Sequence, residues 1–218
     1  VADAVLGADD VIQVVDQDEI PGTGRAVQLA LQALPGFSGD VLVLSADVPL
    51  LDADTIHALR AAHRATGAAA TLLSAVMDDP TGYGRIIREN DGSVARIVEQ
   101  KDANDDEAAV NEINAGVYLF QAEALRTHLD LVGMANAQGE KYLTDVVGLL
   151  RASRLSVAVT AAVDAAATLG VNDRVQLSDA ARILNARTVR AWQLQGVTVI
   201  DPATTWIDVT ATLARDVT

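Results

Sequence analysis

An α/β fold with a mostly parallel sheet is predicted by three features of this sequence. Residues 41–44 form a continuous apolar run, which is typical of a parallel strand buried on both faces. Residues 71–76 are predicted to form another buried strand, and residues 54–66 between the two strands have the composition of a helix. Strand, helix and strand joined by short connections indicate parallel pairing. Half of the 218 residues are hydrophobic, enough for the core of one large domain.

Other short elements are predicted around the first apolar run: a β-rich segment at 11–15, a turn at 18–24, and helices at 25–34 and 54–66. Pro35 and Gly36 end the first of these helices, because proline removes a backbone donor and restricts the residue before it. Asp52 or Asp54 is the expected N-cap of the second helix, and Gly67 lies just past its end.

The middle of the chain departs from this pattern. Residues 85–89 and 94–99 are β-rich and flank Asn90-Asp91-Gly92, which is a strong signal for a hairpin. Such an antiparallel excursion on a parallel sheet builds a lid or a wall of a substrate site. The charged residues 102–107 lack bulky apolar side chains and indicate an exposed loop.

Further elements complete the predicted sheet and its helical layers: strands at 113–120 and 156–162, helices at 122–131 and 144–152, and a loop at 133–139. Thr144 or Asp145 is the expected cap of the second helix. Aromatic residues make up only 3% of the chain, so the core must be built from Ala, Val, Leu and Ile.

A long helix is predicted from Asn172 to near Gly196, where glycine favours a C-terminal stop. Its apolar face is predicted from i+3 and i+4 spacing to comprise Leu177, Ala181, Leu184, Thr188, Ala191 and Leu194. Such a helix either forms an arm between two domains or packs on the sheet. The tail at 197–218 changes to short β-rich pieces, and Ile207 and Leu213 are six residues apart, as in hexapeptide β-helix repeats.

Composition excludes several functions. A formal net charge of −14 argues against nucleic acid or an anionic membrane as a partner, because both require basic surface. No stretch approaches the roughly 18 to 20 apolar residues of a membrane span. The absence of cysteine excludes disulfides and thiolate chemistry, and with no secretory signal visible it predicts a cytoplasmic protein. The start at Val1 indicates an internal stretch of a longer protein.

Two segments are candidate sites on local grounds. Asp47 follows the first apolar run, and ligands bind beyond the carboxyl ends of strands in open α/β sheets. It is therefore either a metal-binding or catalytic carboxylate or part of a strand-end turn. The Gly-rich residues 17–26 lead into a helix and allow a backbone to approach a flat or anionic ligand, although a plain turn has the same composition. They match neither the Rossmann fingerprint nor the P-loop.

Four further segments contain Gly, Glu and Asn at the ends of predicted strands and helices: residues 81–86, 98–103, 112–116 and 170–174. Each alone is also explained as a turn, a surface ion pair, a strand start or a helix cap. Carboxylates and neutral amides at strand ends equally suit hydrogen bonds to sugar hydroxyls.

Taken together with residues 136–145 and Asp201-Pro202-Ala203, these segments closely resemble a known family in their order and spacing. It is the uridylyltransferase domain of the bacterial bifunctional N-acetylglucosamine-1-phosphate uridylyltransferase and glucosamine-1-phosphate acetyltransferase. The resemblance covers residues 11–218. It implies a Rossmann-like nucleotidyltransferase domain at 1–173, a linking helix at 174–196, and the start of a left-handed β-helix at 197–218.

The resemblance also implies the reaction and the residues that perform it. A phosphate oxygen of N-acetylglucosamine-1-phosphate attacks the α-phosphorus of UTP, with Mg²⁺ as cofactor, and pyrophosphate leaves. By position, the implied site residues are Gln17, Gly22 and Thr23 for the uracil end, Asp47 and Asn172 for catalysis and Mg²⁺, Gly84, Glu99 and Asn114 for the sugar, and Thr144 near the sugar phosphate.

The chain departs from the family pattern at several positions. Ser45-Ala46 replaces Tyr-Gly, Arg25 stands where His is favoured, Gln100 replaces the His of a His-Lys-Asp motif, and Lys141 replaces the first Tyr of a pair. The family's opening strand and Gly-rich phosphate loop are not in the sequence, so we expect the chain alone to be inactive. His57, His63 and His128 match no family site residue and are expected on helix surfaces or in the core.

Two alternatives remain open from the sequence: another sugar-nucleotide pyrophosphorylase, or a non-catalytic fragment that binds a sugar nucleotide. The resemblance implies a homotrimer held by the β-helix for the whole protein and a monomer for this chain.

Overall fold

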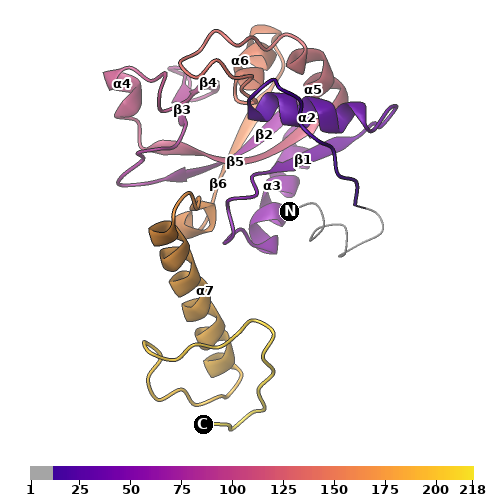
Figure 1. Cartoon of the computed structure of the whole chain (residues 1–218). Coiled ribbons are helices and arrows are strands. Elements are labelled where there is room, and N and C mark those ends of the chain that lie inside the picture. The colour runs from indigo at the N-terminus through magenta and orange to yellow at the C-terminus, as the bar shows by residue number, and fades with distance from the viewer. Residues whose placement is uncertain (1–11) are drawn as a thin grey trace.

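The computed structural model of the chain describes residues 12–218 and shows an α/β body from which one long helix extends (Figure 1). Its strands are β1 (Asp40–Leu44), β2 (Ala70–Val76), β3 (Arg85–Arg88), β4 (Val94–Val98), β5 (Glu112–Gln121) and β6 (Val157–Ala161). Its helices are α2 (Thr23–Gln32), α3 (Ala53–Thr66), α4 (Asp105–Ala108), α5 (Ala122–Leu129), α6 (Asp145–Ala152) and α7 (Arg174–Leu194), with a 3₁₀ turn η1 (Ala165–Thr168).

The sheet is mixed, which corrects the prediction of a mostly parallel one. Its strand order is β4-β3-β5-β2-β6, and β1 pairs with β5 beside this path. Within residues 12–218, only the pairing of β2 with β6 is parallel. β1, β2 and β6 run in one direction, and β5 lies antiparallel between β1 and β2. The α/β class is confirmed, because helices cover both faces of this sheet.

β1 is not buried on both faces, as its apolar run predicted. Val41 and Val43 pack against the core, whereas Leu42 is 38% exposed and Leu44 is 47% exposed. In the part of the chain that the structure describes, β1 pairs only with β5, so its other edge is unpaired as well. β2 has the predicted character, since every residue from Ala70 to Ala75 is buried between β5 and β6.

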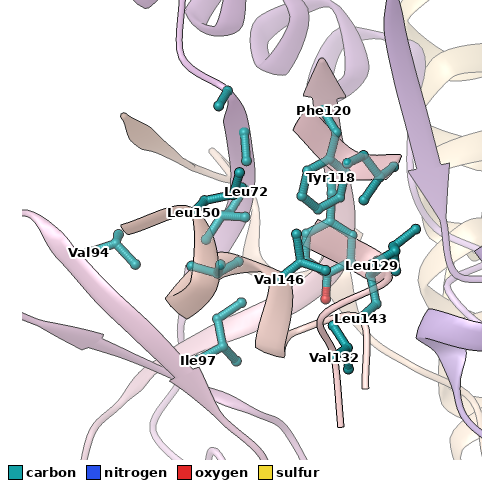
Figure 2. Packing of buried hydrophobic residues seen from close by; sticks show 14 of the residues in the cluster. Leu72, Val94, Ile97, Tyr118, Phe120, Leu129, Val132, Leu143, Val146 and Leu150 are labelled. Carbon is teal, nitrogen blue, oxygen red and sulfur yellow. The ribbon is translucent and has the colours of Figure 1, made fainter. Parts of the chain in front are cut away.

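Two apolar clusters lie on opposite faces of the sheet, because side chains alternate along each strand. The larger contains Leu72 and Phe120 from the sheet and Val146 and Leu150 from α6, and it also includes side chains of α2 and α5 (Figure 2). Tyr118 and Phe120 stack within it, with ring centroids 5.6 Å apart. The other cluster packs α3 against the strands through Leu59, which is fully buried. The result is a three-layer arrangement.

Several local predictions are confirmed. Asp52 caps α3, because its side chain accepts a hydrogen bond of 2.8 Å from the Thr55 amide. Gly67 ends this helix in the left-handed conformation, with φ of 59°. β3 and β4 form the predicted antiparallel hairpin, in which Ile86 faces Ile97.

Other local predictions are wrong. Residues 12–15 form no strand, and residue 11 lies outside the described residues. Part of the predicted loop at 102–107 is the one-turn helix α4, which a capping box between Asn104 and Glu107 stabilises. Thr144 precedes α6 without capping it, because its hydroxyl donates to Glu99 instead.

α7 extends away from the α/β body and does not pack on the sheet (Figure 1). Its buried residues are Ala180, Asn185 and Val189, whereas the predicted face includes Leu177 and Leu194, which are exposed. Residues 197–218 contain no strand and close into a loop, because the Thr198 amide donates to the Val217 carbonyl oxygen at 2.8 Å. None of the helices within residues 12–218 has both the length and the apolar character needed to cross a bilayer.

Candidate active site

Asp47 and Asn172, which the family pattern pairs, meet at one end of the sheet. The carbonyl oxygen of Asp47 accepts a hydrogen bond of 2.8 Å from the Val171 amide, which joins the segment after β1 to the segment before α7. A Cβ atom placed on Gly170 would lie 3.9 Å from Asp47 Oδ2 and 3.8 Å from Asn172 Nδ2. Both side chains are therefore next to the same residue, and both are exposed to solvent.

This pair fits a Mg²⁺ ion that takes most of its ligands from elsewhere. Magnesium prefers oxygen ligands and commonly keeps one or two protein ligands, with phosphates and water completing the octahedron. Asp47 supplies a carboxylate, and Asn172 supplies an oxygen once its amide turns Oδ1 toward that carboxylate. Within residues 12–218, no cluster of three His, Cys, Asp or Glu side chains forms a fuller cage.

The four residues assigned to the sugar and its phosphate form two hydrogen-bonded pairs in close contact, which together make up the sugar cluster. The Asn114 amide donates to the Gly84 carbonyl oxygen at 2.8 Å, joining β5 to the start of β3. The Thr144 hydroxyl donates to Glu99 Oε1 at 2.8 Å. A Cβ on Gly84 would lie 3.3 Å from Glu99 Oε2 and 3.2 Å from Ile97 Cγ2, so the two pairs are closely packed at this glycine.

A tyrosine that the sequence analysis did not single out belongs to this cluster. The Asn114 side-chain amide donates to the Tyr118 hydroxyl at 2.6 Å, and both residues are buried. Burial raises the pKa of Tyr118, so its hydroxyl stays protonated. The apolar surroundings of Tyr118 in β5 suggest only a core residue, which explains why the sequence did not reveal it.

Glu99 lies in an environment that disfavours its charge. Burial raises the pKa of Glu99, and the hydrogen bond from Thr144 opposes this shift. The carboxylates of Asp145, Asp102 and Glu140 raise the pKa further. A carboxyl group whose pKa is raised, and which already accepts one hydrogen bond, still has other lone pairs that can accept a hydrogen bond from a sugar hydroxyl.

The backbone of the Gly-rich turn, which the sequence predicts to approach a ligand, lies against the backbone of Lys141. Gly22 has φ of 112°, and a Cβ there would lie 2.4 Å from the Lys141 carbonyl oxygen. The Gly24 amide donates to that oxygen at 2.8 Å. Thr23 Oγ1 accepts from the Leu143 amide at 3.2 Å, and Gln17 Nε2 donates to the Gly22 carbonyl oxygen at 3.1 Å.

A cavity of about 410 Å³ connects the nucleotide and metal residues. Thr23 from the Gly-rich turn and Asp47 both line it, together with Ser45, Gly116 and Tyr118. Because Tyr118 also bonds to Asn114, the cavity reaches the edge of the sugar cluster. The predicted site residues thus form three groups at one end of the sheet, and the geometry brings all three together.

The positions that depart from the family pattern have defined partners. Ser45 Oγ donates to the Gly116 carbonyl oxygen at 3.1 Å, and Arg25 forms an ion pair with Asp18. Lys141 Nζ donates to Gln28. These side chains therefore have structural roles.

The histidines lie where the sequence analysis expected them. His63 is buried beside Thr71, with Nδ1 and Oγ1 2.8 Å apart. His128 is buried in α5 near Ser153, and His57 is exposed on α3.

The chain is similar in sequence to known proteins over almost its full length. Residues 8–209 match the family described as "Nucleotidyl transferase". The bifunctional protein GlmU of Leifsonia xyli subsp. xyli is 61% identical over 206 residues, covering 94% of this chain and 42% of that protein. The protein of the same name from Kineococcus radiotolerans is 53% identical over 219 residues, covering 100% and 44%. The chain thus spans less than half the length of these relatives.

Solved structures share the fold at lower identity. UDP-glucose pyrophosphorylase complexed with UDP-glucose superimposes with a TM-score of 0.53 and 16% identity, covering 67% of this chain and 57% of that chain. The apo form of a UDP-glucose pyrophosphorylase gives a TM-score of 0.52 and 17% identity, covering 68% and 55%. At this identity the likeness shows the fold alone.

Proposed function

This chain belongs to the nucleotidyl transferase family, as its motifs predicted, and we propose on that basis that the whole protein transfers uridylyl from UTP to N-acetylglucosamine-1-phosphate. The products are UDP-N-acetylglucosamine, a precursor for the cell wall, and pyrophosphate. The observation that carries the proposal is the position of Asp47, which lies beside Asn172 and also lines the cavity that reaches Tyr118 and the sugar cluster.

The reaction is an in-line displacement at phosphorus. A phosphate oxygen of the sugar phosphate forms a bond to the α-phosphorus of UTP, while the bond to the bridging oxygen breaks and its electron pair leaves with pyrophosphate. When bound, Mg²⁺ neutralises charge on the phosphates. The chain's own residues hold the reactants in line, which is the main contribution of protein to phosphoryl transfer.

Each group of residues has a defined part in this proposal. Asp47 and Asn172 hold the metal at the end of the sheet, and Thr23 with its turn holds the uridine. Glu99 and Asn114 accept and donate hydrogen bonds at the sugar hydroxyls and the acetamido group. Thr144 keeps Glu99 oriented through its hydroxyl.

The proposal extends to the organisation of the whole protein. Residues 1–173 form the nucleotidyltransferase domain, 174–196 the linking helix, and 197–218 the entry to a left-handed β-helix that carries acetyl transfer. The whole protein assembles as a trimer through that β-helix and acts in the cytoplasm. The relatives are bifunctional proteins by name, which supports two activities in one chain.

The substitution Asp47→Asn in the whole protein tests the metal assignment. It removes one negative oxygen from the pair while keeping the size of the side chain. We expect Mg²⁺-dependent release of pyrophosphate from UTP and N-acetylglucosamine-1-phosphate to fall by about 100-fold or more. Acetyl transfer in the same preparation stays at the wild-type rate, because it belongs to another domain.

Asp54→Asn is the matched control, because Asp54 lies in the first turn of α3 outside the site. It should leave uridylyl transfer unchanged. Full uridylyl transfer by Asp47→Asn would refute the metal assignment. Faster turnover of dTTP or glucose-1-phosphate by the wild-type protein would refute the substrate assignment.

A further inference from the structure

Arg85 is a buried cation without a carboxylate partner. Its residue is only 1% exposed, and no ion pair within residues 12–218 includes it. Its guanidinium donates to the Tyr83 carbonyl oxygen, to Gln100 Oε1 at 2.8 Å and to the Ala108 carbonyl oxygen at 3.4 Å, while Nε has no partner among residues 12–218. Burying a charged group whose hydrogen bonds and charge are only partly compensated costs free energy. This network is therefore better explained by a positioning role than by stability.

The network leads from the sugar cluster to the metal pair. Gln100 Oε1 also accepts from the Gly82 amide at 3.0 Å. The turn before β3 is therefore held both by Arg85, through the Tyr83 carbonyl oxygen, and by Gln100, through the Gly82 amide. At the other end of Tyr83, the hydroxyl accepts from the Gly170 amide at 3.1 Å. That hydroxyl lies 3.9 Å from the Cβ position of Gly170, the same point that Asp47 and Asn172 approach.

We propose that Tyr83 is a positioning residue for the Asp47–Asn172 pair, and that Arg85 and Gln100 hold Tyr83 in place. This inference rests on the proposed function, because it assigns a metal to that pair. Tyr83 is half-buried and packs against the apolar cluster that contains Leu59 of α3, and its hydroxyl makes the contact with Gly170.

The arrangement gives the two halves of the site one common support. Gly84, which follows Tyr83, bonds through its carbonyl oxygen to Asn114 of the sugar cluster. Tyr83 therefore helps to set the positions of both the sugar cluster and the metal ligands. In-line transfer depends on such spacing, because a misplacement of about 1 Å can cost about 100-fold in rate.

Amide hydrogen exchange in this chain tests the contact without any enzyme assay. Tyr83→Phe keeps the ring and removes the acceptor, so we expect the Gly170 amide to exchange about tenfold faster by NMR. Tyr142→Phe is the matched control, since the Tyr142 hydroxyl also accepts one hydrogen bond, from Gln138 Nε2 at 2.8 Å. It should leave the Gly170 amide unchanged.

Metal dependence in the whole protein tests the consequence for the site. Tyr83→Phe should raise the Mg²⁺ concentration for half-maximal uridylyl transfer by about tenfold, as expected for loss of a group that orients a ligand. Gln100→Ala should act in the same direction. If both residues act through one network, the double variant will show less than the sum of the two effects.

The two measurements separate the two claims. An unchanged exchange rate of the Gly170 amide in Tyr83→Phe overturns the positioning role, and so does a Mg²⁺ dependence that moves no further than in Tyr142→Phe. Faster exchange supports the positioning role even if the whole wild-type protein transfers no uridylyl, an outcome that overturns only the proposed function.

Discussion

Glu99 and Glu112 show how differently two carboxylates behave near the ends of two strands, β4 and β5, that flank β3. For Glu99, burial raises the pKa, and one hydrogen bond from Thr144 does not offset it. For Glu112, burial also acts to raise the pKa, but the charged hydrogen bonds from Arg88 outweigh it and lower the value. The ion pair with Arg88 thus favours the charged form of Glu112, whereas burial disfavours the charged form of Glu99.

This difference predicts opposite pH dependences of stability. Because the folded-state pKa of Glu99 is raised, its contribution to stability is complete below its ordinary value of 4.5 and is lost as the pH rises through the folded value. We expect the free energy of unfolding of the wild type, relative to Glu99→Gln, to fall as the pH rises from 4 to 7. Urea unfolding of both proteins across this range measures it.

Glu112→Gln is the control, for which we expect the opposite pH dependence of the free energy of unfolding. The pKa of Glu112 is lowered, so its contribution is present above its ordinary value and is lost as the pH falls. The wild type should therefore gain stability relative to Glu112→Gln over the same rise in pH. Parallel curves for the two variants would contradict the assignment of Glu99 to a site that disfavours charge.

At the level of elements, the Gly-rich turn is fixed by the segment that precedes α6. Two backbone hydrogen bonds join them, from the Gly24 amide to the Lys141 carbonyl oxygen and from the Lys141 amide to the Pro21 carbonyl oxygen, at 2.8 and 2.9 Å. The two backbones approach so closely that no side chain fits between them at Gly22. The start of α2 is therefore set by a contact more than a hundred residues away in the sequence.

Replacing Gly22 tests this docking. Gly22→Ala adds a methyl group 2.4 Å from the Lys141 carbonyl oxygen in a conformation with φ of 112°. Gly39 has a comparable φ of 118°, but a Cβ there meets only Phe37 Cζ at 4.0 Å. We expect Gly39→Ala to lower the free energy of unfolding by about 1–2 kcal/mol from backbone strain alone. Gly22→Ala should cost about 1–3 kcal/mol more.

Chemical denaturation of the two variants measures this difference. Because the added cost arises from the clash with Lys141, uridine nucleotides should also bind more weakly to the whole protein carrying Gly22→Ala. Equal destabilisation by the two substitutions would show that the turn is free to move away from Lys141.

At the scale of the whole molecule, Asn185 connects the long helix to the tail. Its side-chain amide donates to the Thr205 carbonyl oxygen at 2.8 Å and accepts from the Ile207 amide at 3.0 Å. Asn185 is buried, although it lies in a helix whose buried positions are otherwise apolar. The bidentate contact holds the loop of residues 197–218 against the end of α7.

Asn185→Ala should release this loop. It removes the partners of two half-buried backbone groups, the Thr205 carbonyl and the Ile207 amide, at a cost of about 1 kcal/mol for each lost hydrogen bond. We expect limited proteolysis to cleave residues 197–218 faster than in the wild type, while fragments of the α/β body persist. Gln193→Ala, at an exposed position of the same helix, is the control and should leave the cleavage rate unchanged. Equal protection of the tail in both variants would refute the anchoring role.

Features that depend on a few neighbouring residues were determined by the sequence alone. The cap of α3 by Asp52, its end at Gly67, and the hairpin around Asn90-Asp91-Gly92 all follow from local hydrogen bonds and turn conformations. The assignment of Asp47 and Asn172 came from the family pattern, and the structure places them together.

Only the tertiary structure decided the features that join distant parts of the chain. The apolar composition of a strand does not determine whether the strand beside it is parallel or antiparallel. The antiparallel position of β5 between β1 and β2 was therefore not predictable from either strand. The buried side of α7 depends on what the tail covers. The contact of Tyr83 with Gly170 spans 87 residues. Local periodicity encodes which residues form an element, whereas pairing partners and side-chain reach depend on how the elements pack.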